Sequence, residues 1–219
     1  MTSPSPRIKI CGLTTPTHLA AAIDAGADMA GFVFFEKSPR HIDLAVARVL
    51  GMMAAGRILK VALTVDARDD DLSTIVDELA PDLLQLHGTE SPERVGAVKA
   101  RFGLPVIKAI GVASAVDVGS AAPYAGVADI LLYDAKPAPG AAVPGGAGVA
   151  FDWSLLAGLD PDGSWMLSGG LDAANVGEAL RATRAPGVDV SSGVESARGV
   201  KDAALIEAFV RAARGGAAG

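Results

Sequence analysis

The sequence predicts an α/β fold in which eight parallel strands, alternating with helices, close into a (β/α)₈ barrel. Half of the 219 residues are hydrophobic but only 5% are aromatic, so Ala, Val, Leu and Ile must build the core. Short apolar runs recur along the whole chain, and Ala-rich stretches separate them. Such alternation is typical of parallel sheets, whose strands are buried on both faces and therefore apolar throughout.

We interpret each apolar run as a strand because polar or glycine residues end it. The predicted strands are Arg7–Cys11, Met29–Phe34, Ile58–Val65, Asp82–Leu86, Pro105–Ile110, Asp129–Tyr133, Ser164–Leu167 and Gly187–Val190. The predicted helices are Thr17–Ala25, Asp43–Ala55, Asp70–Leu79, Glu93–Phe102, Asn175–Thr183 and Asp202–Arg214. The first helix follows Thr15 and Pro16, a capping residue and a proline suited to the first helical turn.

One domain over residues 1–219, with an ordered core at about residues 7–214, accommodates all of these elements. An open doubly wound sheet is the alternative, but an open sheet of eight strands usually needs a longer chain. The stretch Lys136–Gly148 is rich in Gly, Pro and Ala, like a linker. Because it falls between the sixth and seventh strands, we interpret it as an active-site loop.

Charge and cysteine content exclude several classes of function. The net charge is −6 and no basic stripe suited to nucleic acid stands out. The single cysteine excludes an internal disulfide and a Cys-rich metal site, and the three histidines are scattered. No apolar run reaches the ~20 residues of a membrane span. We therefore expect a cytoplasmic protein that binds a small molecule. We expect it to contain no metal or cofactor and to bind neither nucleic acid nor a membrane.

In this fold the carboxyl ends of the strands and the loops after them carry function. Cys11 ends the first strand and Asp134 ends the sixth. A thiolate at Cys11 could act as a base, although a free cysteine is commonly a small buried hydrophobe. The Asp134 carboxyl is a candidate general acid, the alternative being a cap for a following helix. Lys136, Pro137 and Pro139 disfavour a helix that begins at once.

Glycine turns follow the seventh and eighth strands, where barrels often bind phosphate. The candidate phosphate-binding residues are Gly169, Gly170, Ser191, Ser192 and Gly193. Glycines let backbone amides approach a ligand, and each segment is expected to lead into a helix whose N-terminus favours an anion. The alternative is that these are simply two tight turns.

Four further polar residues near the strand ends are candidate substrate contacts: Arg40, Gln85, His87 and Asp189. Arg40 could grip a carboxylate with two hydrogen bonds, or it could be solvated like most loop arginines. His87 is better interpreted as a rim histidine than as a catalytic one, and Asp66 and Asp189 could be hydrogen-bond acceptors behind the site.

Nine short segments match one enzyme family in order along nearly the whole chain. They are Lys9–Thr14, Gly31–Phe34 with Lys37–Arg40, Gln85–Gly88, Leu131–Asp134, Gly145–Gly148 with Phe151–Trp153, Ser168–Leu171 and Val188–Glu195. Together they resemble phosphoribosylanthranilate isomerase, the TIM-barrel enzyme of tryptophan biosynthesis.

The resemblance implies an Amadori rearrangement of N-(5′-phosphoribosyl)anthranilate to 1-(2-carboxyphenylamino)-1-deoxyribulose 5-phosphate. It makes Asp134 the general acid that opens the ribose ring to a Schiff base. It makes Cys11 the general base that removes the C2′ proton, giving an enolamine that tautomerises to the ketone. Arg40 matches the family's contact to the anthranilate carboxylate, and the glycine turns match its phosphate site.

Two positions depart from the family pattern. Val149 stands where a lysine is frequent, and Asp66 where asparagine is frequent. Val149 weakens any catalytic role for a lysine of the loop between the sixth and seventh strands. The prolines and glycines of this loop suggest a lid that excludes water.

Two other functions remain as alternatives. One is the related histidine-pathway isomerase, whose chemistry typically uses two aspartates, and a cysteine ending the first strand argues against it. The other is a non-catalytic phosphosugar-binding barrel, which would need neither Cys11 nor Asp134. The family is commonly monomeric, so we expect a monomer, with a dimer as the alternative.

Overall fold

The computed structural model describes residues 5–136, 151–160 and 163–216, and these form the predicted closed barrel. The barrel strands are β1 (Arg7–Cys11), β2 (Met29–Phe34), β3 (Leu59–Thr64), β4 (Leu83–Leu86), β5 (Val106–Val112), β6 (Ile130–Ala135), β7 (Trp165–Leu167) and β8 (Gly187–Val190). Each pairs in parallel with the next, and β8 pairs with β1 to close the ring. Every predicted strand is confirmed to within two residues at each end.

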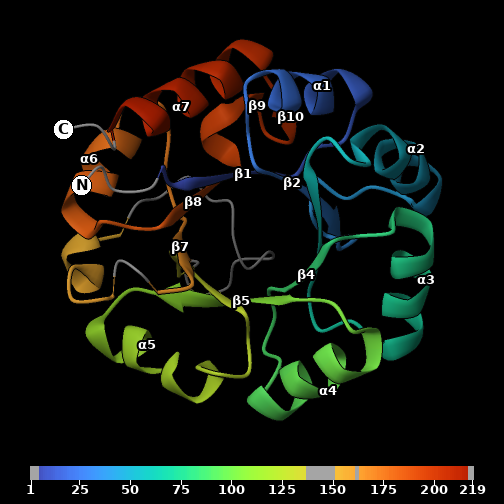
Figure 1. Ribbon diagram of the computed structural model, residues 1–219, viewed down its shortest axis with the longest axis horizontal. Coiled ribbons are helices and arrows are strands. Elements are labelled where there is room, and N and C mark those ends of the chain that lie inside the picture. Colours follow the sequence, from blue (N-terminus) through green and yellow to red (C-terminus); the bar gives the residue numbers. More distant parts are fainter. Residues whose placement is uncertain (1–4, 137–150, 161–162, 217–219) are drawn as a thin grey trace.

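Helices surround the strands in an outer ring (Figure 1). They are α1 (Pro16–Asp24), α2 (Leu44–Ala54), α3 (Asp69–Leu79), α4 (Pro92–Phe102), α5 (Ala115–Gly119), α6 (Val176–Thr183) and α7 (Ala203–Gly216). Local side chains set where several begin. The Thr15 hydroxyl accepts from the His18 N–H at the start of α1, and the Asp43 carboxylate caps α2 in the same way.

The connections after β5, β6 and β8 contain short elements that were not predicted. After β5 lies only the five-residue α5, followed by the 3₁₀ turn η1 (Ala122–Tyr124), and after β6 the 3₁₀ turn η2 (Trp153–Leu156). The sequence predicts that the segment after β8 leads directly into an α-helix, but it does not. It forms the 3₁₀ turn η3 (Ser192–Val194) and a hairpin of β9 (Glu195–Ala197) and β10 (Val200–Lys201) before α7 begins.

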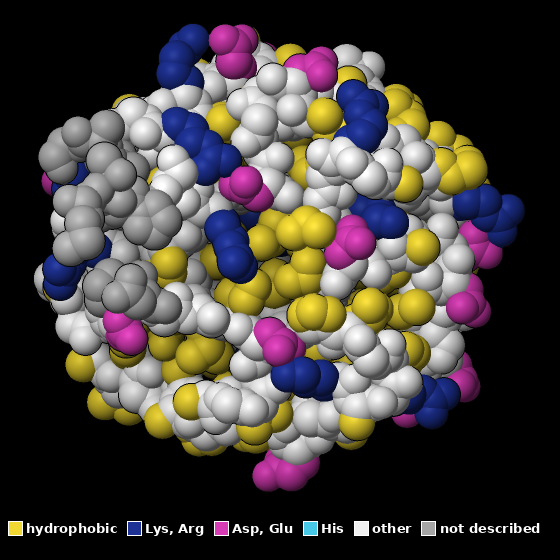
Figure 2. All heavy atoms as spheres, in the orientation of Figure 1, with side chains coloured by type: hydrophobic (Ala, Val, Ile, Leu, Met, Phe, Trp, Pro, Cys, Tyr) yellow, Lys and Arg dark blue, Asp and Glu magenta, His cyan; other side chains and the backbone are white. Residues whose placement is uncertain are grey.

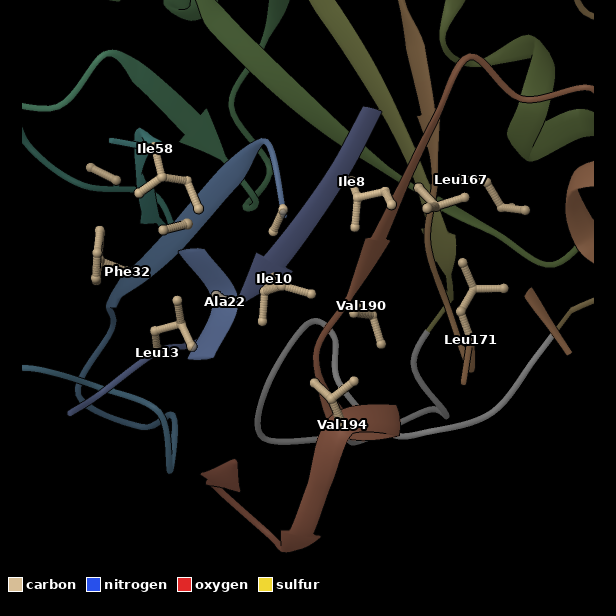
Figure 3. Packing of buried hydrophobic residues seen from close by; sticks show 14 of the residues in the cluster. Ile8, Ile10, Leu13, Ala22, Phe32, Ile58, Leu167, Leu171, Val190 and Val194 are labelled. Carbon is tan, nitrogen blue, oxygen red and sulfur yellow. The ribbon is translucent and has the colours of Figure 1, made fainter. Parts of the chain in front are cut away.

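Successive strand residues point to opposite faces, so the barrel has two apolar layers. Ile8 and Ile10 of β1 point outward, into the layer between barrel and helices. There they pack with Leu167 of β7, Val190 of β8 and Ala22 of α1 (Figure 3). A second cluster fills the barrel interior: Met29, Val61, Leu83, Ile107, Ala109, Ile130, Leu132 and Met166. In Figure 2, hydrophobic side chains gather at the centre of the ring and charged side chains lie around them.

Among the described residues, no helix is both long enough and apolar enough to span a bilayer.

Candidate active site

Polar side chains replace the apolar interior toward the carboxyl ends of the strands. They are Lys9 and Cys11 from β1, Gln85 from β4, His87 directly after it, Asp134 from β6, Ser168 directly after β7, and Asp189 from β8. Their contacts divide them into one group around Cys11 and another around Asp134. The predicted pair Cys11 and Asp134 thus lies in one barrel, on strands separated by β7 and β8.

Cys11 is 5% exposed and packs against Val33 and Leu63 on its apolar side. Burial raises the pKa of its thiol above the ordinary value, because a thiolate loses its hydration there. The nearby Lys9 ammonium is the largest influence that lowers this pKa, and Asp189 opposes it. The site therefore holds a thiol whose ionisation depends on the charges around it.

Asp189 and Lys9 form an ion pair inside the barrel. The Lys9 Nζ lies 2.8 Å from Asp189 Oδ1, and the Ser168 hydroxyl donates to Asp189 Oδ2 at 3.1 Å. The two residues are direct neighbours across the β1–β8 pairing. Both carboxylate oxygens of Asp189 thus have partners within the chain, as expected of an acceptor behind the site, and its contact to substrate stays a prediction.

Asp134, His87 and Gln85 form a second group of polar contacts. Gln85 Nε2 lies within hydrogen-bond distance of His87 Nδ1, at 3.0 Å. His87 Nε2 lies 3.3 Å from Asp134 Oδ2, and Asp134 Oδ1 accepts from the Ala135 N–H at 2.9 Å. Gln85 is fully buried and holds His87 in place. The contacts of Gln85 and His87 to substrate stay predictions.

Arg40 lies against the end of β1. Gly12, at φ +80°, has no side chain, and a Cβ there would lie 2.6 Å from Arg40 Cδ. The Arg40 Nε and Nη2 donate to the two carboxylate oxygens of Glu195 at 2.7 and 2.9 Å. Lys201 Nζ also reaches Glu195, at 2.7 Å. Arg40 is therefore a buried, oriented guanidinium and not a solvated loop arginine.

The glycine turns after β7 and β8 lie next to each other. A Cβ on Gly193 would collide with the Leu171 carbonyl oxygen, and one on Gly169 would lie 2.6 Å from the Ala135 nitrogen beside Asp134. The Ser191 hydroxyl donates to the Cys11 carbonyl at 3.1 Å. The candidate phosphate-binding residues thus border both the Cys11 and the Asp134 groups.

Sequence reasoning gave no role to four contributors to this region: Lys9, Ser168, Glu195 and Lys201. Only Lys9 has a local signal, since a charged residue two positions before Cys11 shares its strand face. Asp66 is a hydrogen-bond acceptor, and its carboxylate accepts from the N–H and the hydroxyl of Thr89 in the loop after β4.

The predicted lid lies outside the described residues, apart from Lys136, and so does Val149. Within the described part of the chain, no cluster of three or more His, Cys, Asp or Glu could hold a metal ion.

A family model for N-(5′-phosphoribosyl)anthranilate (PRA) isomerase matches residues 8–212. The chain belongs to the N-(5′-phosphoribosyl)anthranilate isomerase family. A relative of that name from Nitrobacter winogradskyi is 59% identical over 207 residues, which are 94% of this chain and 92% of the relative. One from Mesorhizobium japonicum is 56% identical over 94% of each chain.

Solved structures of the family share the fold. Phosphoribosyl anthranilate isomerase from Thermotoga maritima superimposes with a TM-score of 0.87 at 34% identity, covering 96% of this chain and 99% of its own. A family structure in complex with reduced 1-(o-carboxyphenylamino)-1-deoxyribulose 5-phosphate gives 0.83 at 32% identity and the same coverage. Membership of the PRA isomerase family makes the chain an isomerase of tryptophan biosynthesis, as the resemblance implied.

Proposed function

We propose that this chain converts N-(5′-phosphoribosyl)anthranilate into 1-(2-carboxyphenylamino)-1-deoxyribulose 5-phosphate, with Asp134 as general acid and Cys11 as general base. The observation that carries the proposal is the polar layer at the carboxyl end of an otherwise apolar barrel interior. This layer holds the Cys11 thiol and the Asp134 carboxyl on separate strands. A family neighbour that binds the reduced form of the product supports the choice of substrate.

The rearrangement needs two proton transfers at different atoms of one sugar. Asp134 gives a proton to the ribose ring oxygen, the C1′–O bond breaks, and the nitrogen lone pair forms the Schiff base. The Cys11 thiolate then takes the C2′ proton, and the C–H electrons form the C1′–C2′ double bond of the enolamine. The enolamine tautomerises to the ketone, so the product is an isomer of the substrate. General acid and base groups must lie on opposite sides of the sugar for this sequence.

The binding roles follow from the charges of the substrate. Arg40 binds the anthranilate carboxylate, since a planar guanidinium matches a carboxylate in charge and shape. The turns with Gly169, Gly170, Ser191, Ser192 and Gly193 bind the phosphate. The Ser191 hydroxyl already contacts Cys11 and Lys201, so we assign its phosphate contact to its backbone N–H. Gln85, His87 and Asp189 contribute around the sugar.

Substitution of the acid and the base tests the proposal. We expect Cys11→Ala and Asp134→Ala each to lower kcat by about 10² to 10⁴, the range of general acid–base catalysis. Turnover is followed as loss of substrate fluorescence, with a no-enzyme control because the substrate is unstable. The matched control is Arg48→Ala, which removes an exposed ion pair with Glu78 on the outer helices and should retain full activity. Near-normal turnover in both site variants would show the mechanism to be wrong.

A separate measurement tests the role of Arg40. We expect Arg40→Ala to raise KM, because the carboxylate loses its partner, with a smaller change in kcat. An unchanged KM contradicts this assignment.

We also propose that the protein is a cytoplasmic monomer. In the described part of the chain, the exposed large apolar residues are spread over several elements: Leu44, Val49 and Met52 on α2, Leu59 on β3, Val116 on α5, Val200 on β10 and Leu205 on α7. Scattered apolar residues are normal on a monomer's surface. The Thermotoga maritima relative is described as dimeric, so a dimer is the alternative. Sedimentation velocity of the purified chain distinguishes the two.

A further inference from the structure

Lys9 is a lysine with no exposed surface, two residues before Cys11 on the same strand. Alternate residues of a strand share a face, so both side chains point into the barrel. Burying an ammonium is costly unless it is paired, and Lys9 is paired with Asp189 at 2.8 Å. This pair could be replaced by apolar residues in a barrel that needed only packing. Its position beside Cys11 therefore calls for a chemical explanation.

The Lys9 ammonium and the Cys11 sulfur border the same point in the barrel. Gly31 on β2 lies opposite Cys11 in the strand pairing. A Cβ placed on Gly31 would lie 3.0 Å from Cys11 Sγ and 3.1 Å from Lys9 Nζ. The absent side chain at Gly31 thus leaves the space in which the two groups meet.

Three charged groups influence the Cys11 thiol: Lys9 on β1, Asp189 on β8 and Lys201 on β10. Lys9 has the largest effect of the three, and it favours the thiolate. Burial is the largest single influence on Lys9 and lowers its pKa, but the charges and hydrogen bonds of Asp189 and Cys11 together hold that pKa above its ordinary value. The ammonium is therefore charged throughout the pH range in which a thiol titrates.

We propose that Lys9 is a positioning residue that stabilises the Cys11 thiolate, while Asp189 and Ser168 hold its ammonium beside the sulfur. This inference rests on the proposed function, in which Cys11 is the base. Lys9 keeps its proton throughout and makes no covalent bond. When the thiolate takes the C2′ proton, the sulfur becomes neutral and the Lys9–Asp189 pair remains. The barrel thus places a fixed positive charge beside the Cys11 sulfur, which must be negatively charged before it takes the proton.

The chain has one cysteine, so its thiolate can be titrated directly by ultraviolet absorbance, with Cys11→Ser as the baseline. We expect Lys9→Met to raise the pKa of Cys11 by at least one unit, which means about tenfold less thiolate at any lower pH. Lys108→Met is the matched control. Lys108 is equally buried and paired with Glu90 at 2.8 Å, but it is not among the charges that act on Cys11. Its titration should coincide with that of the wild type.

Lys9→Met leaves Asp189 as an unpaired buried charge and can prevent folding. The double variant Lys9→Met/Asp189→Asn removes both charges together and avoids this. Because Lys9 acts on the thiol more strongly than Asp189 does, we expect the pKa of Cys11 to rise in the double variant as well. A titration that coincides with the wild type in either folded variant overturns the inference.

Activity separates this inference from the function on which it rests. In Lys9→Met, kcat/KM should fall about tenfold or more at neutral pH and recover at higher pH, a recovery that structural damage alone would not give. If Cys11→Ala keeps normal turnover, the proposed function fails, whatever the titration shows. If Cys11→Ala is inactive but Lys9→Met leaves the thiolate titration unchanged, only the role of Lys9 fails.

Discussion

Glu195 joins two buried cations, and Glu195→Gln should destabilise the protein strongly. Its carboxylate, 4% exposed, accepts from the Nε and Nη2 of Arg40, from Lys201 Nζ, and from the Gly199 N–H at 3.0 Å. Burial alone would raise the pKa of Glu195, but the hydrogen bonds and charges of Arg40 and Lys201 lower it to about 2. A neutral amide at this position removes the negative charge that Glu195 supplies to both cations.

The size of the effect follows from this shift. The ordinary pKa of a glutamate is 4.5, and each unit of difference corresponds to about 1.4 kcal/mol, so the ionised Glu195 contributes about 3 kcal/mol. Because the folded-state pKa is lowered, this stability is fully present above pH 4.5. It is lost as the pH falls from 4.5 toward 2, where the carboxylate is protonated in the folded state too.

Urea denaturation followed by circular dichroism, at several pH values from 7 to 3, measures this contribution. The unfolding free energy of Glu195→Gln should be about 3 kcal/mol below that of the wild type at pH 7, and the gap should narrow toward pH 3. Glu78→Gln is the control, since its ion pair with Arg48 is exposed and worth little. A loss below about 0.5 kcal/mol at pH 7, or a gap that is constant with pH, would refute the reasoning.

Two further outcomes are expected. Because the pKa of Cys11 is raised, most of the base is protonated at neutral pH. The ratio kcat/KM should therefore increase about tenfold per pH unit up to that pKa. Initial rates measured across pH test this, and a flat profile contradicts it. Gly12→Ala should cost about 1–2 kcal/mol of stability from its positive φ and also raise KM, because the methyl group displaces Arg40. Gly26→Ala shares the positive φ but has no atom within 4 Å of its Cβ, so it should lose stability with KM unchanged.

The strands could be predicted from the sequence because buried parallel strands are continuous apolar runs with polar ends. The helices with clear caps were equally predictable. The segment after β8 was not, because Ser192–Val194 forms a 3₁₀ turn and a hairpin precedes α7. These short elements are fixed by contacts with other loops, such as the close approach of Gly199 to the Pro39 carbonyl.

The positions of Cys11 and Asp134 at the strand ends could be predicted, but their partners could not. The Lys9–Asp189 contact joins residues 180 positions apart, and the Arg40–Glu195 contact joins residues 155 apart. Such pairs depend on the register with which β8 closes on β1 and on the loop after β8. No local pattern in one sequence specifies them.

The most direct measurement is the reaction of the purified wild-type protein with freshly generated N-(5′-phosphoribosyl)anthranilate. The expected result is a loss of fluorescence well above the no-enzyme rate, with a product of unchanged mass that carries a ketone. Binding of the substrate without turnover would contradict the account and would instead identify a non-catalytic phosphosugar-binding barrel.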